Sequence, residues 1–131
     1  MIRGIIIAHG HIGEAFIDAV KSIVGECDEL YSISVSDMSA ADIRERLLAL
    51  VNAPLTEKKG IVIMACLKGG SSWNVAASIA AENDRVRVLS GVNLSMVLAF
   101  LTKRNTMELD ELTAEIRKRS QAGVDMLKSG S

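Results

Sequence analysis

The histidines of this 131-residue chain are confined to one short stretch near its N-terminus. His9 and His11 occur in "GIIIAHGHIG", residues 4–13, directly after an apolar run of strand length. A neutral imidazole can serve as a nucleophile, a general base or a metal ligand. We expect His9 to lie at the tip of a strand. His11 follows in a loop, where a hydrogen-bonded structural role is the more common one.

A second polar stretch, "LKGGSSWN" at 67–74, follows another apolar run. Residues 69–72, two glycines followed by two serines, can direct backbone N–H groups toward one point just before a helix N-terminus, which is an arrangement that binds anions. A Gly-Gly-Ser turn is also an ordinary connection from strand to helix, and the full GxxxxGK[ST] phosphate loop is absent. Lys68 is interpreted as a solvated loop residue, and Trp73 as either a core residue or part of a contact surface.

The elements that must position these residues alternate along the chain. Short runs rich in Ile and Val predict four strands, at 2–8, 30–35, 60–66 and 85–89. Apolar residues at helical spacing predict five helices, around 16–23, 43–51, 71–82, 93–103 and 107–121. Ser39 and Asp42 form a capping-box pattern at the start of the second helix, and Pro54 falls just past its end.

Alternating strands and helices predict an α/β fold, a three-layer open sheet of four parallel strands with helices on both faces. Right-handed crossovers bring the C-terminal ends of parallel strands to one edge, where ligands of such sheets bind. The loops expected there are "HGHIGE", "SDMSA", "LKGGSSWN" and "SGVNLS". Histidine, glycine pairs and hydroxyl groups are therefore predicted to gather at one rim, which could receive a phosphate.

Composition restricts the function classes. The length fits a single domain, 1–131, and the net charge of -1 with interspersed acids and bases favours no nucleic-acid partner. Cys27 and Cys66 are isolated, without metal-ligand spacing, so we expect free thiols and no metal site. No signal-peptide pattern and no run of about 18 apolar residues is present, which predicts a cytoplasmic protein.

Three motifs in order, "IIIAHGHIGEAFIDAV", "GIVIMACLKGGSSWNVAASIA" and "SGVNLSMVLAFL", resemble the mannose-type IIA domain of the bacterial phosphoenolpyruvate-dependent sugar phosphotransferase system. The resemblance covers essentially the whole chain. It implies that His9 carries a phosphoryl group and that no cofactor is needed. It also implies a phosphoryl-binding cradle formed by Gly69, Gly70 and Ser71, with Asn93 in the neighbouring loop.

One position departs from the family pattern. Members usually hold the second ring nitrogen of the phosphohistidine with a carboxylate three positions before the glycine pair, and here that position is Cys66. A neutral thiol is a weaker acceptor than a carboxylate, so we expect slower phosphorylation or a less stable phosphohistidine. Asp37, after the second strand, is the alternative partner. The family's proline after "GGS" is replaced by Ser72, which is a milder change.

The resemblance implies a phosphotransferase that accepts a phosphoryl group from HPr at His9 and passes it to a IIB component, and through IIB to a sugar entering by a membrane permease. Permease components would bring such a protein to the membrane periphery. Members are typically homodimers that exchange a short C-terminal strand, and residues 123–127 stand where that strand would be. The alternative is a regulatory or binding module with weakened or sensory phosphorylation, because of Cys66.

Two other classes are disfavoured. Histidine phosphatases and mutases also place a histidine at a strand end, but they need an arginine before it, and Ala8 occupies that position. The related dihydroxyacetone kinase phosphocarriers lack the "GGS..N" turn found here. The sugar and the IIB partner are not encoded in these motifs, since specificity in such systems lies in the permease.

Overall fold

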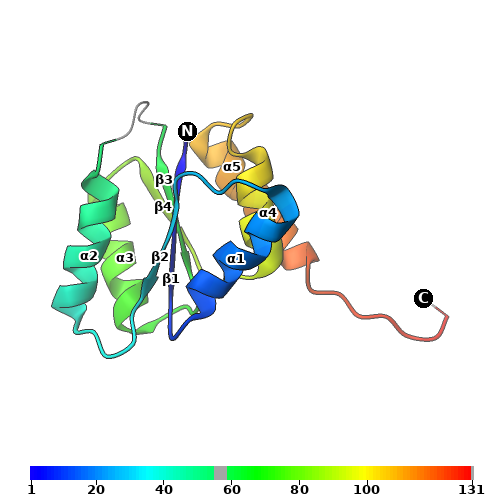
Figure 1. Cartoon of the computed structure of the whole chain (residues 1–131), viewed down its shortest axis with the longest axis horizontal. Helices are drawn as coiled ribbons and strands as arrows, with labels where there is room; N and C mark the ends of the chain where they lie inside the picture. The colour runs from blue at the N-terminus through cyan, green and yellow to red at the C-terminus, as the bar shows by residue number, and fades with distance from the viewer. Residues whose placement is uncertain (55–58, 131) are drawn as a thin grey trace.

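The computed structural model describes residues 1–54 and 59–130 (Figure 1). The strands are β1 (Arg3–Ala8), β2 (Leu30–Ser34), β3 (Ile61–Ala65) and β4 (Val86–Leu89). The helices are α1 (Ile12–Val24), α2 (Ala40–Asn52), α3 (Gly70–Glu82), α4 (Leu94–Lys103) and α5 (Leu109–Ala122). The four strands and five helices predicted from the apolar runs are all present, and the largest difference in bounds is the earlier start of α1. The further short strand expected at 123–127 is not formed within the single chain.

The four strands form one parallel sheet in the order β2-β1-β3-β4. Ile6 of β1 lies opposite Ser32 of β2 on one side and Met64 of β3 on the other. Helices α2 and α3 cover one face of the sheet, while α1, α4 and α5 cover the other (Figure 1). The predicted three-layer α/β architecture is confirmed.

Side chains of β1 alternate between two hydrophobic cores. Ile5 and Ile7 contribute to the core beneath α2 and α3, whereas Ile6 and Ala8 contribute to the core beneath α1, α4 and α5. All four are buried, because successive residues of a strand face opposite sides of the sheet and helices cover both. Each fully buried isoleucine stabilises the fold by about 2 kcal/mol. The unbroken apolar run before His9 therefore anchors the strand that presents it.

Gly4 allows a close approach between β1 and α4. A Cβ atom at this position would lie 2.6 Å from Cε2 of Phe100 and 2.9 Å from Cδ1 of Leu30. Phe100 is fully buried, so its ring has little room to move away. The absence of a side chain at Gly4 thus lets an aromatic ring pack directly on the backbone of a central strand.

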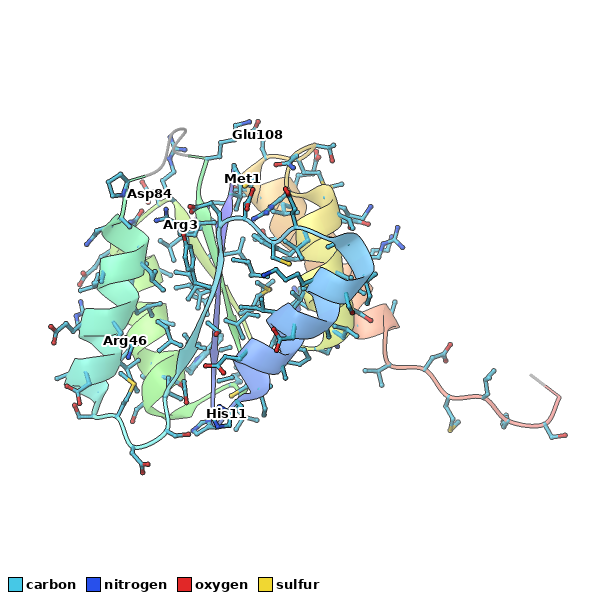
Figure 2. All side chains as sticks on the ribbon, in the orientation of Figure 1. Met1, Arg3, His11, Arg46, Asp84 and Glu108 are labelled. Atoms are coloured by element: carbon cyan, nitrogen blue, oxygen red, sulfur yellow. The ribbon has the colours of Figure 1, made fainter. Side chains whose placement is uncertain are left out.

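The edge where the strands begin is held by a buried arginine. Arg3 is 2% exposed, and its guanidinium donates to the Glu29 carboxylate and to the carbonyl oxygens of Leu50 and Ala53, at 2.7 and 2.9 Å for the two carbonyls. The hydrogen bond from Arg3 holds the pKa of Glu29 below its ordinary value. Figure 2 shows Arg3 and Met1 at this end of the sheet and His11 at the opposite end.

Arg104 supports the same edge from the C-terminal end of α4. It is 4% exposed and donates to the carbonyl oxygens of Asp28 and Ile2, and its guanidinium lies 5.2 Å from the centre of the Phe100 ring. Burial lowers the pKa of Arg104 from its ordinary value. The two arginines tie β1 and the loop before β2 to α2 and α4.

After α5 the chain runs away from the domain (Figure 1). Residues 124–130 form no helix or strand within the single chain. Val124, Met126 and Leu127 are 79%, 75% and 88% exposed, respectively. β4 is an edge strand, so its outer side could pair with this exposed apolar segment from a second copy of the chain. The exchange of the segment between two copies stays a prediction.

Candidate functional site

The loops that follow the strands meet at one edge of the sheet, as predicted. The backbone N–H of Gly10, after β1, donates to the hydroxyl of Ser36, after β2, at 2.8 Å. At the other side of the sheet, the N–H of Val92, after β4, donates to the carbonyl of Ala65 at the end of β3, at 3.0 Å. These bonds join neighbouring loops into one rim at the C-terminal ends of the strands.

His9 and Cys66 form the central pair of this rim. Nδ1 of His9 lies 3.4 Å from Sγ of Cys66, a distance at which either atom can be the donor, depending on the tautomer. The backbone N–H of Cys66 donates to the carbonyl of Ile7 at 3.0 Å, which fixes the thiol beside the end of β1. His9 is exposed and Cys66 is partly exposed. Among the described residues the ring has no other polar contact, so Nε2 is left open to solvent.

His11 occupies a different environment. It is the N-cap residue of α1 but makes no side-chain capping bond, and its side chain is 92% exposed. Its Nδ1 lies 3.7 Å from a carboxylate oxygen of Glu14, one turn along the same helix. His9 alone of the two contacts a side chain from another strand end.

Asp37 does not replace the missing carboxylate in this structure. Its backbone has a φ of 60°, in the left-handed region, and its side chain is exposed. In residues 1–54 and 59–130, no hydrogen bond or ion pair joins it to His9. Cys66 is the residue that contacts the ring. Its correspondence to the carboxylate of the family pattern stays a prediction.

The N-terminus of α3 is open. Gly69 is the N-cap residue with a φ of 94°, and Gly70 begins the helix with a φ of 81°, a conformation that glycine adopts without strain. Among the residues that the structure describes, no side chain caps this helix or accepts from its first N–H groups, and Ser71 is exposed beside them. A helix start of this kind can bind a phosphoryl group. It begins only a few residues after Cys66.

Asn93 has a structural task that the sequence analysis missed. Its Oδ1 accepts a hydrogen bond from the N–H of Met96 at 2.8 Å, which caps α4, and its Nδ2 donates to the carbonyl of Ser120 in α5 at 3.0 Å. Asparagine just before an apolar helical run is a signal for such a cap. A contact between Asn93 and a phosphoryl group stays a prediction.

Lys68 and Trp73, on either side of the glycine pair, lie in different environments. Lys68 is exposed, in agreement with its interpretation as a solvated loop residue. Trp73 is partly buried and packs against the core beneath α2 and α3, so it contributes to packing on that side of the sheet.

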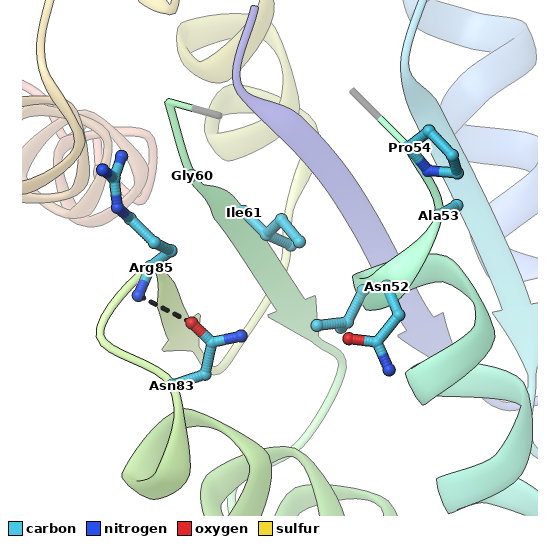
Figure 3. Close-up of a pocket in the computed structure, with 8 residues that line it drawn as sticks. Asn52, Ala53, Pro54, Gly60, Ile61, Asn83 and Arg85 are labelled. Carbon is cyan, nitrogen blue, oxygen red and sulfur yellow. Dashed lines mark hydrogen bonds between the residues drawn. The ribbon is translucent and has the colours of Figure 1, made fainter. Parts of the chain in front are cut away.

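A cavity of about 450 Å³ lies at the opposite edge of the sheet (Figure 3). Its lining includes Asn52, Pro54, Gly60, Asn83 and Arg85, and the N–H of Arg85 donates to Oδ1 of Asn83 at 2.9 Å. The described lining carries no histidine, cysteine or carboxylate. This cavity and the His9–Cys66 pair therefore lie at opposite ends of the sheet.

Residues 4–117 match the model of the EIIA-man family, described as PTS system fructose IIA component. The chain belongs to this family. The match confirms the resemblance seen in the three sequence motifs and covers every strand and helix up to the middle of α5.

Individual EIIA proteins give the same picture. The PTS system sorbose-specific EIIA component of Klebsiella pneumoniae is 33% identical over 117 residues, which are 89% of this chain and 85% of that protein. The PTS system mannose-specific EIIAB component of Escherichia coli K12 is 28% identical over 125 residues, 92% of this chain but only 38% of that longer protein. The crystal structure of the phosphotransferase system component EIIA from Streptococcus agalactiae superimposes with a TM-score of 0.87 at 28% identity, covering 96% of this chain and 97% of that chain.

Family membership makes this chain a IIA component of the sugar phosphotransferase system, a class of phosphotransfer proteins. None of the helices in the described part of the chain has the length and apolar character of a membrane span.

Proposed function

We propose that this EIIA protein is a phosphocarrier that accepts a phosphoryl group from HPr on His9 and passes it to a IIB component. The observation that carries the proposal is the placement of His9. A buried strand presents it at the sheet edge, Cys66 contacts its Nδ1, and its Nε2 has no partner among the described residues.

Nε2 is then the nucleophile. As its lone pair forms a bond to phosphorus, the bond from phosphorus to the donor breaks, and the donor leaves with that electron pair. The ring gains cationic character, which Cys66 offsets best when its sulfur accepts a hydrogen bond from Nδ1–H. The open N-terminus of α3, with Gly69, Gly70 and Ser71, supplies N–H donors to the phosphoryl oxygens. We propose that Asn93, which caps α4, also contacts the phosphoryl group.

The partners follow from the same proposal. HPr is the donor, and a IIB component is the acceptor that leads to a membrane permease, which places the protein in the cytoplasm beside that permease. The EIIAB relative joins a IIA and a IIB part in one protein, which supports a IIB acceptor here. The exposed Val124, Met126 and Leu127 favour a homodimer in which the segment pairs with the β4 edge of a second copy.

The phosphoryl acceptor is tested by intact mass. The full chain, His9→Ala and His11→Ala are incubated with phosphoenolpyruvate, enzyme I and HPr. We expect the wild type and His11→Ala to gain one phosphoryl group and His9→Ala to gain none. Phosphorylation of His9→Ala together with loss in His11→Ala would reverse the assignment.

The dimer is tested by removing residues 124–131, which leaves α5 intact. We expect the full chain to sediment as a dimer and the truncated chain as a monomer or as aggregates. A truncated chain that remains a stable dimer would show that the segment is not required.

A second candidate function is a regulatory module of the same fold. The contact between the thiol of Cys66 and His9 favours it. In that case phosphorylation of His9 would serve as a signal to another protein, without onward transfer. The two functions separate when phosphorylated protein is mixed with the IIB component encoded nearest to it. Transfer to IIB supports the carrier, and retention of the phosphoryl group supports the module.

A further inference from the structure

We propose that Cys66 is a reversible thiol switch on His9, and that a mixed disulfide between Cys66 and a small thiol compound prevents phosphoryl acceptance. This inference rests on the proposed function of His9 and adds a regulation to that site. It starts from a pair of nucleophilic side chains, since Sγ of Cys66 lies 3.4 Å from Nδ1 of His9.

The thiol lies at the partly exposed rim beside His9. Cys66 is partly exposed, His9 is exposed, and the loop that follows Cys66, residues 67–71, is exposed throughout. A small disulfide can therefore reach the sulfur without unfolding any strand or helix. Both cysteines are partly exposed and pack against the same core, but Cys27 precedes β2 at the opposite edge of the sheet, far from His9, so it provides an internal comparison.

The imidazole gives the thiol a base within contact distance. In the exchange, Nδ1 of His9 takes the thiol proton, and the thiolate of Cys66 attacks one sulfur of a small-molecule disulfide. A new S–S bond forms as the old one breaks, and the second half of the reagent leaves as a thiolate with the bonding electron pair. That thiolate or the solvent then takes the proton from His9. The reverse exchange with a small thiol restores Cys66.

A mixed disulfide at Cys66 weakens the electrostatic stabilisation that the sulfur provides to the imidazole ring. A thiol sulfur accepts Nδ1–H weakly, and a thiolate accepts it strongly and offsets the positive charge of a phosphorylated ring, whereas the sulfur of a mixed disulfide cannot become a thiolate. The added group also occupies space directly beside the exposed imidazole. Both effects oppose attack by Nε2. A protein with a carboxylate at this position could not be regulated in this way, because a carboxylate does not form a disulfide.

The experiment uses the full chain with Cys27→Ser, so that Cys66 is the single thiol. Methyl methanethiosulfonate, which transfers a CH₃S group to a thiolate, is the probe. The first readout is the rate of modification by intact mass, without any phosphotransfer protein, in the Cys27→Ser chain with His9 and with His9→Gln. We expect His9→Gln to slow the modification by about tenfold, because the neighbouring base is lost.

The second readout is phosphorylation by HPr. We expect the modified chain to accept phosphate about tenfold more slowly or not at all, and dithiothreitol to restore the unmodified rate. A Cys66→Asp variant in the same background should be unaffected by the reagent. Equal rates before and after modification would overturn the switch. If neither the reduced chain nor Cys66→Asp is phosphorylated, the proposed function fails, and the switch on it fails with it, whatever the rates of modification.

Discussion

Replacing Cys66 with Asp should accelerate phosphorylation of His9 by HPr. The substitution introduces a carboxylate at the position where the family resemblance implies one, and Sγ of Cys66 at that position lies 3.4 Å from Nδ1 of His9. Cys66 is partly exposed and its side chain lies at the rim, so a carboxylate can be accommodated without burying a charge.

The size of the effect follows from the contact. Sulfur and Nδ1 are separated by 3.4 Å, which is a weak interaction for a neutral thiol. An aspartate oxygen reaches farther from Cβ than sulfur does, and it can approach Nδ1–H to about 2.8 Å in a charge-assisted bond, roughly twice as strong as a neutral one. A gain of about 1.4 kcal/mol in the transition state, where the ring becomes cationic, corresponds to about a tenfold higher rate.

The rate is measured by rapid-quench phosphorylation with excess phosphorylated HPr, for the wild type, Cys66→Asp, Cys66→Ala and Asp37→Asn. We expect the phosphorylation rate to be highest for Cys66→Asp, intermediate for the wild type and lowest for Cys66→Ala. The rate of Asp37→Asn should equal that of the wild type. Far-ultraviolet circular dichroism provides the control that all four chains are folded.

One pattern of rates would refute the reasoning. If Cys66→Asp were as slow as the wild type or slower, and Asp37→Asn lost most of its rate, Asp37 would be the residue that orients His9. The added carboxylate would then repel the existing one.

Two further predictions concern stability. Glu29→Gln should lower the free energy of unfolding by about 2 kcal/mol at pH 7, because a charged hydrogen bond to buried Arg3 is weakened. Since the folded pKa of Glu29 is lowered, this difference should be present above about pH 4.3 and shrink as the pH falls through the folded pKa, measured by urea unfolding at several pH values. Gly4→Ala should cost about 2 kcal/mol through overlap with Phe100, and Phe100→Leu in the same chain should recover part of that loss in thermal melts; an additive loss in the double variant would exclude this overlap as the cause.

The sequence alone predicted the elements and the edge that carries the chemistry, for identifiable reasons. Ser39 and Asp42 form both halves of a capping box in the structure, and Pro54 follows the end of α2, so local chemistry set that helix. The strands were recognised because both faces of a parallel sheet are buried, which produces unbroken Ile and Val runs. His9 was placed at a strand tip for the same reason.

What the sequence could not provide depends on three-dimensional contacts. Arg3 looks like an isolated charge near the N-terminus, yet it is buried because carbonyl oxygens some fifty residues away accept hydrogen bonds from its guanidinium. The two hydrogen bonds of Asn93 link α4 with α5, and no local pattern specifies the second one. The choice between Cys66 and Asp37 as the neighbour of His9 likewise required the positions of three strand ends.

The separation of the two edges has a consequence for how this protein can diverge. Arg3 and Arg104, whose removal would leave unsatisfied carbonyl groups, lie where the strands begin, whereas His9 and Cys66 lie where the strands end. Residue 66 is bonded to β1 through its backbone N–H, which every residue except proline possesses. We therefore expect substitutions at residue 66 to keep this backbone bond and to change the reactivity of the neighbouring imidazole more than the melting temperature of the domain.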